Sequence, residues 1–332
     1  NRCSPRFPPS RDAVMWKVEG KGTEGRGMRR FALLLAALLV LVPLPAQAGT
    51  PIAVDDGAVF GSHGGSVTTA NTSATALDDL DPVLEDYTAT WCTNCVDVEH
   101  ALEDLVAERG GAIFSFHRSI GETEDPFGTD ELDERWEERY DRRAPPTVVF
   151  NGTTMVIGSV PEGDSLLDDF RTLANHSLEI PAGATSIFSW TASQSGSTTV
   201  SWEVNLPESE AWAGHQIRLE VWVVEATATF SEGTNGQGEY PHIVRSISTV
   251  DEVAWDGAVS LRGSSAVALS PAFDGDDLEV HLIHSLVPPT VPDEVDDIAP
   301  IAEPDERGIP APGAALALVA FVAASRRRDL NP

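Results

Sequence analysis

Residues 87–95 read Tyr-Thr-Ala-Thr-Trp-Cys-Thr-Asn-Cys, and they join an apolar run at 83–90 to a segment with helical periodicity at 92–109. Two of the three cysteines in the sequence, Cys92 and Cys95, lie in this stretch. Two cysteines three residues apart can open and close as a disulfide, which indicates redox chemistry. A cysteine in the first turn of a helix meets free backbone N–H groups and the positive end of the helix dipole, and both stabilise a thiolate. This predicts Cys92 as the attacking group and Cys95, one turn deeper, as the resolving one.

Apolar and amphipathic segments alternate throughout residues 77–178. The expected strands are 83–90, 112–116, 147–151 and 155–157, and the expected helices are 92–109, 130–140 and 165–174. Asn151-Gly152 predicts a tight turn between the last two strands. The resulting order of strands and helices predicts an α/β domain, a central mixed sheet with helices on its faces.

The sequence pattern changes in residues 179–285, where short β-type runs are separated by Gly, Ser, Pro and Asp. These runs are 187–190, 198–204, 217–224, 242–247, 258–261 and 278–283. Their number and spacing predict an all-β, Ig-like sandwich. The tryptophans of this region are expected in its core, with a sugar-binding face as the alternative; they are Trp190, Trp202, Trp212, Trp222 and Trp255. Residues 49–76, rich in Gly, Ser, Thr and Ala, predict a linker or an added edge strand.

Residues 28–48 have the parts of a secretory signal peptide. A basic start at Arg29 and Arg30 precedes a short apolar run at 31–42, and an Ala-Gln-Ala end precedes Gly49. We therefore expect cleavage before Gly49. Residues 1–27 are then upstream of the signal and absent from the mature protein; a disordered basic arm is the alternative.

The segment that follows the predicted signal peptide is strongly acidic. Residues 1–48 hold eight of the 22 basic and three of the 52 acidic side chains, so the remaining chain carries a net formal charge of −35. A surface of this sign repels nucleic acid and anionic lipid headgroups, so neither is expected as a partner.

The C-terminal residues predict a tether. Residues 286–308 are rich in Pro, Asp and Glu, which is typical of an extended stalk. Residues 309–328 contain an apolar stretch closed by Arg326, Arg327 and Arg328, which predicts a transmembrane segment with its basic end in the cytoplasm. This combination resembles the sorting tags of archaeal and bacterial surface proteins; a plain single-pass anchor is the alternative. Either one places the body of the protein at the cell surface or in the extracytoplasmic space, anchored to the membrane.

Residues 77–176 resemble the thioredoxin fold in several motifs that occur in the expected order. Residues 87–95 resemble its active-site segment. Residues 143–150, Arg-Ala-Pro-Pro-Thr-Val-Val-Phe, resemble its cis-proline segment, with Pro146 at the cis position. Asp86 lies six residues before Cys92, where thioredoxins carry a buried acid that accepts the proton of the resolving thiol.

The resemblance implies a set of functional residues. Cys92, Cys95, Asp86 and Pro146 would be catalytic, with Cys92 and Cys95 forming a redox-active disulfide. Trp91 and Pro145 would border the substrate groove. The dipeptide between the cysteines is Thr93-Asn94, which differs from the Gly-Pro of thioredoxin and the Pro-His of strong oxidants, so the redox poise of either does not transfer.

A zinc site and a structural disulfide are the two alternative roles of the cysteine pair. A zinc site needs about four ligands, and no second cysteine pair is present to complete one, although His100 and His117 could be recruited. A purely structural disulfide is the other alternative, but so small a ring restricts the unfolded chain little.

The sequence as a whole predicts an exported, membrane-tethered thiol–disulfide oxidoreductase. Its partners would be disulfide-bearing exported proteins and a membrane or extracytoplasmic redox protein. No cofactor or metal is expected, because a dithiol itself carries two electrons. The alternative from another class is a non-catalytic surface binding or adhesion protein that uses the β-sandwich, with the thioredoxin fold as a scaffold.

Overall fold

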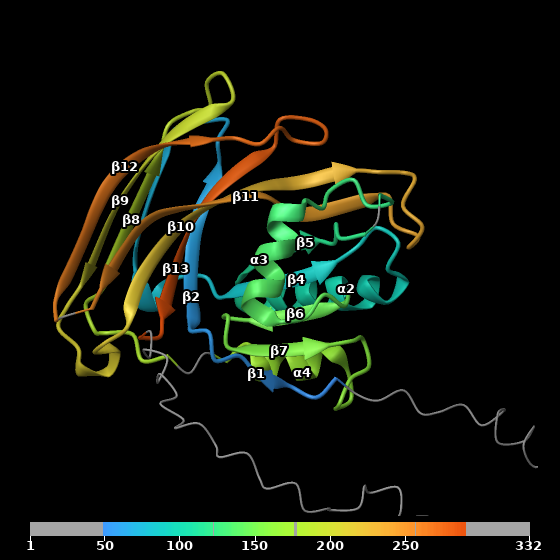
Figure 1. Ribbon diagram of the computed structural model, residues 1–332, viewed down its shortest axis with the longest axis horizontal. Coiled ribbons are helices and arrows are strands. Elements are labelled where there is room, and N and C mark those ends of the chain that lie inside the picture. Colours follow the sequence, from blue (N-terminus) through green and yellow to red (C-terminus); the bar gives the residue numbers. More distant parts are fainter. Residues whose placement is uncertain (1–48, 122, 176–177, 256, 290–332) are drawn as a thin grey trace, which may run out of the picture. The chain divides into compact units, whose positions relative to one another are not determined.

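The computed structural model describes residues 49–289, except 122, 176–177 and 256, as two β-sheets and three α-helices (Figure 1). The predicted signal peptide, most of the acidic stalk and the predicted C-terminal membrane segment lie outside the described residues. Within the described ranges, no helix is long and apolar enough to cross a membrane.

The first half of the described chain is an α/β unit built on four strands. Its elements are β4 (Val83–Thr88), α2 (Thr93–Arg109), β5 (Ala112–His117), α3 (Asp130–Tyr140), β6 (Thr147–Phe150), β7 (Thr154–Ile157) and α4 (Leu166–Leu173). The strands lie in the order β7-β6-β4-β5, with β4 parallel to β5 and the other two pairs antiparallel. This order and these directions are those of a thioredoxin-like fold, and every element predicted for this region is present.

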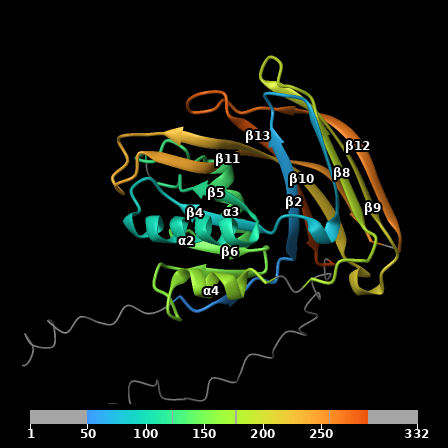
Figure 2. The ribbon, with the colours of Figure 1, turned by 180° about the vertical axis from the view of Figure 1, so that it is seen from behind.

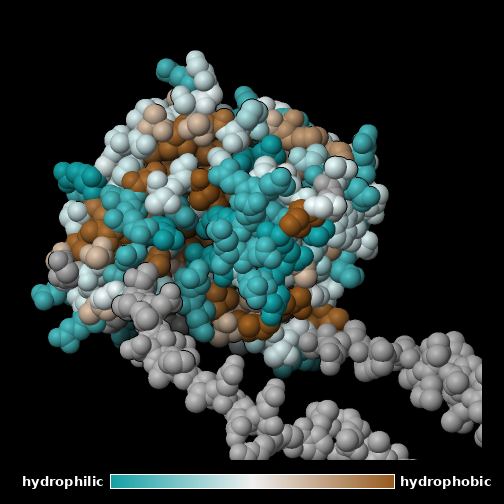
Figure 3. Space-filling view, viewed as in Figure 1, coloured by the Kyte–Doolittle hydropathy of each residue, from teal (hydrophilic) through white to brown (hydrophobic). Residues whose placement is uncertain are grey.

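The helices cover opposite faces of these four strands. Apolar residues of α2 and α4 pack with Leu84 of β4 and Val148 of β6, whereas those of α3 pack with Tyr87 and Val149. Helices α2 and α4 lie on the same side of the strands (Figure 2). Because residues two apart in a strand share a face, Asp86 lies on the same face as Leu84, the face that α2 and α4 cover. The outer side of α3 carries many exposed acidic residues, and the surface in this direction is mostly hydrophilic (Figure 3).

The second half of the described chain contributes long antiparallel strands to both sheets. They are β8 (Thr185–Trp190), β9 (Ser197–Leu206), β10 (Gln216–Thr229), β11 (Glu239–Ala254), β12 (Val259–Ala268) and β13 (Leu278–Val287), with the short 3-10 helix η2 (Glu210–Trp212) between β9 and β10. Each predicted β-type run is found, and β10, β11 and β12 extend well beyond the predicted bounds. Strict alternation in β9 buries Val200, Trp202 and Val204 between the sheets. One large apolar core thus joins the four-stranded sheet to the β2–β13–β10 side of the larger one.

The predicted linker at 49–76 is corrected by the structure, because this segment forms strands. They are β1 (Ile52–Ala53), β2 (Ala58–Ser66) and β3 (Asn71–Ala76), and the 3-10 helix η1 (Leu77–Asp79) follows them. β2 pairs with β13, and β3 pairs with β8 at the edge of the smaller sheet. Glycine in this segment lets β2 approach β13 closely, since a Cβ on Gly64 would lie 2.0 Å from the carbonyl oxygen of Val280. The alternative of an added edge strand is the correct one, because β1 and β2 lie at the two edges of the larger sheet and β3 lies at an edge of the smaller one.

A parallel contact between β5 and β11 unites the two halves into one nine-stranded sheet. The register places Ile243 opposite Ser115. Beside this contact, the Trp222 ring of β10 packs edge-on against Phe114 and Phe116 of β5, with centroids 4.9 and 5.4 Å apart. Trp222 was predicted in the sandwich core, but it lies in the apolar cluster of the α/β unit instead. The other four tryptophans predicted for the core are found there.

Two buried histidines lie between the sheets and are held by serine hydroxyls. His63 contacts Ser73 and Ser186 at 2.9 and 3.0 Å, and Ser186 also contacts His284 at 2.9 Å. Burial, reinforced by His281, lowers the pKa of His63 to about 4. Burial and the neighbouring His63 lower the pKa of His284 to about 3, against a smaller opposing effect of the Gly61 carbonyl. Both side chains are therefore neutral in the folded protein at pH 7.

We predict that these histidines make the sandwich acid-sensitive. Unfolded histidines take up protons below about pH 6.5, whereas the folded ones do so only near pH 4 and 3. The free energy of unfolding should therefore fall as the pH drops from 6.5 to about 4, by up to about 1.4 kcal/mol per pH unit for each histidine. Urea unfolding of a His63→Gln/His284→Gln variant should show a weaker pH dependence than the wild type. His100→Gln, at an exposed position of α2, is the control; equal slopes for the wild type and the double variant would contradict the prediction.

Candidate redox site

The cysteine pair lies where β4 passes into α2. Cys92 is the N-cap residue of α2, and its disulfide with Cys95 closes the first helical turn. Cys92 is 5% exposed and Cys95 is fully buried. A sulfur at the N-cap faces the unpaired N–H groups of the first turn, so on reduction a thiolate at Cys92 is stabilised there. The predicted position of the dithiol at a strand-to-helix junction is confirmed.

The proline loop lies at the same edge of the sheet as the cysteines. The Pro145–Pro146 peptide bond is cis, and the loop leads directly into β6. Because β6 runs antiparallel to β4 with Thr147 opposite Tyr87, Pro146 lies at the end of β4 from which the chain enters the cysteine turn. Pro146 is buried and Pro145 is half-buried. The half-buried Trp91 packs with the two cysteines.

Asp86 is fully buried beneath α2, and neither carboxylate oxygen has a hydrogen-bond partner among the described residues. Burial raises its pKa well above the usual value, and the negative charge of Glu99 raises it further. A carboxyl group in this position holds a proton at pH values where an exposed aspartate has lost it. Asp86 is thus chemically suited to exchange a proton inside the fold.

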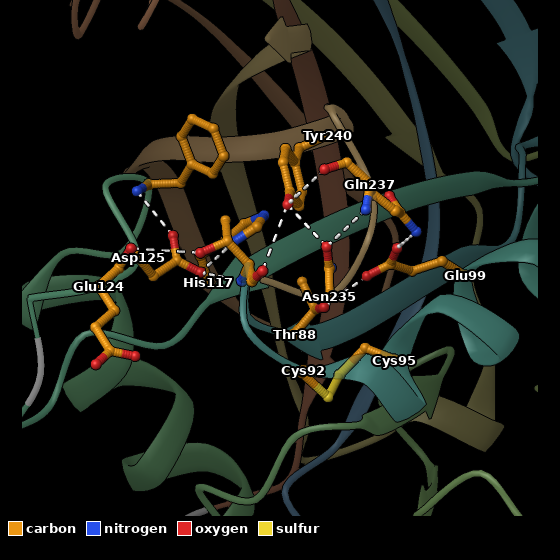
Figure 4. A network of polar contacts seen from close by, with 12 residues as sticks. Thr88, Cys92, Cys95, Glu99, His117, Glu124, Asp125, Asn235, Gln237 and Tyr240 are labelled. Atoms are coloured by element: carbon orange, nitrogen blue, oxygen red, sulfur yellow. Dashed lines mark hydrogen bonds and ion pairs between the residues drawn. A yellow bond between two sulfur atoms is a disulfide. The ribbon is translucent and has the colours of Figure 1, made fainter. Parts of the chain in front are cut away.

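Glu99, one helical turn after Cys95, was not singled out by the sequence. Its carboxylate accepts hydrogen bonds from the Thr88 hydroxyl at 2.6 Å and from Nε2 of Gln237 at 2.8 Å (Figure 4). Gln237 belongs to the loop between β10 and β11, which arrives from the sandwich. A residue of the second half therefore contacts the first turns of α2.

Both backbone polar groups of Thr90, which lies two residues before Cys92, form hydrogen bonds. Its N–H donates to Oδ2 of Asp125 at 2.8 Å. Its carbonyl oxygen accepts the N–H groups of Thr234 and Asn235 at 3.0 and 3.1 Å. The backbone leading into the cysteine turn is thus held by the β5–α3 loop on one side and by the β10–β11 loop on the other.

Asp125 is the centre of a cluster of buried polar groups next to Thr90. Nδ1 of His117 lies 2.8 Å from its Oδ2, and the N–H of Phe127 donates to its Oδ1 (Figure 4). Burial acts to raise the pKa of Asp125, but His117 and the backbone donors outweigh it, so the pKa lies below its usual value. His117, considered from the sequence as a zinc ligand, here pairs with Asp125. No group of three or more His, Cys, Asp or Glu residues suited to a metal ion occurs in the described part of the chain.

We predict that Asp86 lowers stability at alkaline pH. Its folded pKa lies above its unfolded value, so the stability associated with its protonated form is present near pH 4 and is lost as the pH rises through the folded pKa. Asp86→Asn should therefore be more stable than the wild type in urea at pH 8, with a smaller difference at pH 4. The exposed Asp97 of α2 offers a control, because Asp97→Asn should show neither effect. A destabilised Asp86→Asn protein at pH 8 would refute this account of the buried carboxyl.

Comparisons with known proteins add structural neighbours only. No protein-family model matches the sequence, and no curated protein matches it either. A crystal structure of protein AGR_C_4864 from Agrobacterium tumefaciens aligns with 64% of this chain and 95% of its own, at 17% identity and a TM-score of 0.35. HBP35 of Porphyromonas gingivalis aligns with 70% of this chain and 80% of its own, at 14% identity and a TM-score of 0.43. The assignment of a thioredoxin-like fold with a Cys-x-x-Cys disulfide therefore rests on strand order and on the position of the cysteine pair.

Proposed function

We propose that this protein is an exported, membrane-tethered thiol–disulfide oxidoreductase that acts through Cys92 and Cys95. The observation that carries the proposal is the disulfide at the start of α2, at the sheet edge that also holds the Pro145–Pro146 loop. The signal-peptide and tether patterns of the sequence support the location.

The chemistry is an exchange of one disulfide for another. In the reduced protein, the Cys92 thiolate attacks one sulfur of a client disulfide, forms a mixed disulfide and releases the first client thiolate. Cys95 loses its proton and attacks the Cys92 sulfur, which releases the second client thiolate. The client has then gained two electrons, and the Cys92–Cys95 disulfide is restored. When the same steps run in reverse, starting from the Cys92–Cys95 disulfide, a client dithiol is oxidised.

Asp86 is suited to manage the proton of the second step. A neutral Cys95 thiol is a poor nucleophile, and its burial hinders loss of the proton to water. Asp86 lies buried on the face covered by α2, the helix that carries Cys95, and a carboxyl with a raised pKa could take that proton as Cys95 attacks and return it in the reverse direction. Trp91 and Pro146 would shape the groove in which the client lies.

The reaction needs no further cofactor, because the dithiol carries both electrons. A partner thiol oxidoreductase, in the membrane or outside the cytoplasm, would restore the working redox state. Disulfide-bearing exported proteins would be the clients.

We predict that single cysteine substitutions separate the two chemical steps. Cys92→Ser should reduce exchange with a disulfide substrate to the uncatalysed rate, because the attacking sulfur is missing. Cys95→Ser should accumulate mixed disulfides with client proteins, since no group remains to resolve them. Mass spectrometry of the trapped species from an extract of secreted proteins would identify the clients.

The matched control is the Cys92→Ser/Cys95→Ser protein, which should trap nothing. Undiminished exchange in Cys92→Ser, or an empty Cys95→Ser trap, would contradict the proposal and favour the non-catalytic surface-binding alternative.

A further inference from the structure

We propose that residues 230–238, here called the hairpin loop, form one wall of the client-binding groove, and that this groove selects polypeptide segments carrying lysine or arginine beside the reactive cysteine. The inference rests on the proposed function, since it names the client that Cys92 would attack. The hairpin loop joins β10 to β11 and extends from the sandwich over the α/β unit (Figure 1).

The hairpin loop is seated directly on the backbone that precedes the cysteines. The N–H groups of Thr234 and Asn235 donate to the Thr90 carbonyl. Gly233 is required for this approach, because a Cβ there would lie 2.0 Å from the Tyr240 hydroxyl and 3.1 Å from the Thr90 carbonyl oxygen. The loop is thus fitted to the entrance of the cysteine turn.

Aromatic packing ties the hairpin loop to the opposite wall, the β5–α3 loop. The Phe127 ring lies 5.9 Å from that of Phe230 and 5.4 Å from that of Tyr240, measured between centroids. These side chains share one buried cluster with Ala228 and Ile243. Both walls therefore pack on the same apolar cluster.

Between the walls is a surface hollow of about 450 Å³ that reaches Trp91, the residue next to Cys92. Its apolar surface comes from Trp91, Pro126 and Phe230, and its acidic groups are Glu124 and Glu232. This combination suits an extended polypeptide, whose side chains and stems pack on the rings, better than it suits a small thiol.

The charge of the hollow indicates a cationic client. The exposed carboxylates Glu124 and Glu232 come from opposite walls, and neither forms an ion pair with any described residue. A lysine or arginine of the client would pair with these carboxylates.

The test compares two peptides that share one disulfide, one flanked by lysine and arginine and the other by glutamate. We expect the full-length protein to exchange with the basic peptide about fivefold faster in kcat/KM, the size expected of two partly exposed ion pairs. The preference should shrink in high salt, which screens such pairs. In a Glu124→Gln/Glu232→Gln variant it should largely vanish.

Two further variants serve as controls for the peptide comparison. Glu103→Gln/Glu239→Gln removes the same charge from exposed positions outside this hollow and should keep the wild-type preference. Gly233→Ala should displace the wall and should therefore lower kcat/KM for both peptides by a larger factor than for bis(2-hydroxyethyl) disulfide, which is too small to use the wall.

The outcomes separate the two proposals. Normal exchange with bis(2-hydroxyethyl) disulfide, together with an equal preference in the wild type and Glu124→Gln/Glu232→Gln, would overturn the inference and leave the proposed function standing. Unaltered peptide exchange in Gly233→Ala would also overturn it. Absence of exchange with every disulfide would overturn the proposed function and the inference with it.

Discussion

The architecture depends on how the edge of β5 that faces away from β4 is covered. In a four-stranded sheet of order β7-β6-β4-β5, β5 presents unpaired backbone groups along one side, and such an edge must be paired or covered. Here β11 covers it in parallel, and the rings of Phe114, Phe116 and Trp222 seal the contact. Once β11 lies along β5, its hairpin with β10 is carried to the end of the sheet where the cysteines are. The second half of the chain thereby contacts the segment that leads into the Cys92–Cys95 turn.

Polar groups buried around the cysteines extend this coupling from the backbone to the chemistry. Glu99 connects Thr88 of the α/β unit to Gln237 of the hairpin loop, and its charge also acts on the buried carboxyl of Asp86. A shift of the hairpin loop would therefore change both the shape of the hollow beside Trp91 and the electrostatic environment of Asp86. In the function proposed above, substrate access and proton transfer would depend on the same contacts.

Local sequence patterns were sufficient to predict most secondary structure and the cysteine site. Helical periodicity placed α2 after Cys92, and alternation placed β9 and its inward Trp202. Residues 49–76 could not be assigned to a linker or to an edge strand from the sequence, because Gly64 and its neighbours have the composition of a linker. Their need for close approach appears only once β13 is beside them. The β5–β11 pairing and the roles of Glu99, Asp125 and the hairpin loop were also missed. These contacts join residues more than a hundred positions apart, or depend on which face of a strand is covered, and no local pattern encodes them.

The pairing of β2 with β13 has a consequence for the order in which the protein can fold. Ala58 lies opposite Leu286, so the first long strand finds its neighbour only when the last has been made. Without residues 278–287, β2 has no paired strand among the described residues, and β10 keeps only β11. Contacts so distant in sequence are typical of proteins that fold on the millisecond-to-second scale or more slowly. Until β13 is in place, β2 and β10 each expose backbone N–H and C=O groups, which makes the incomplete chain prone to pair with other strands.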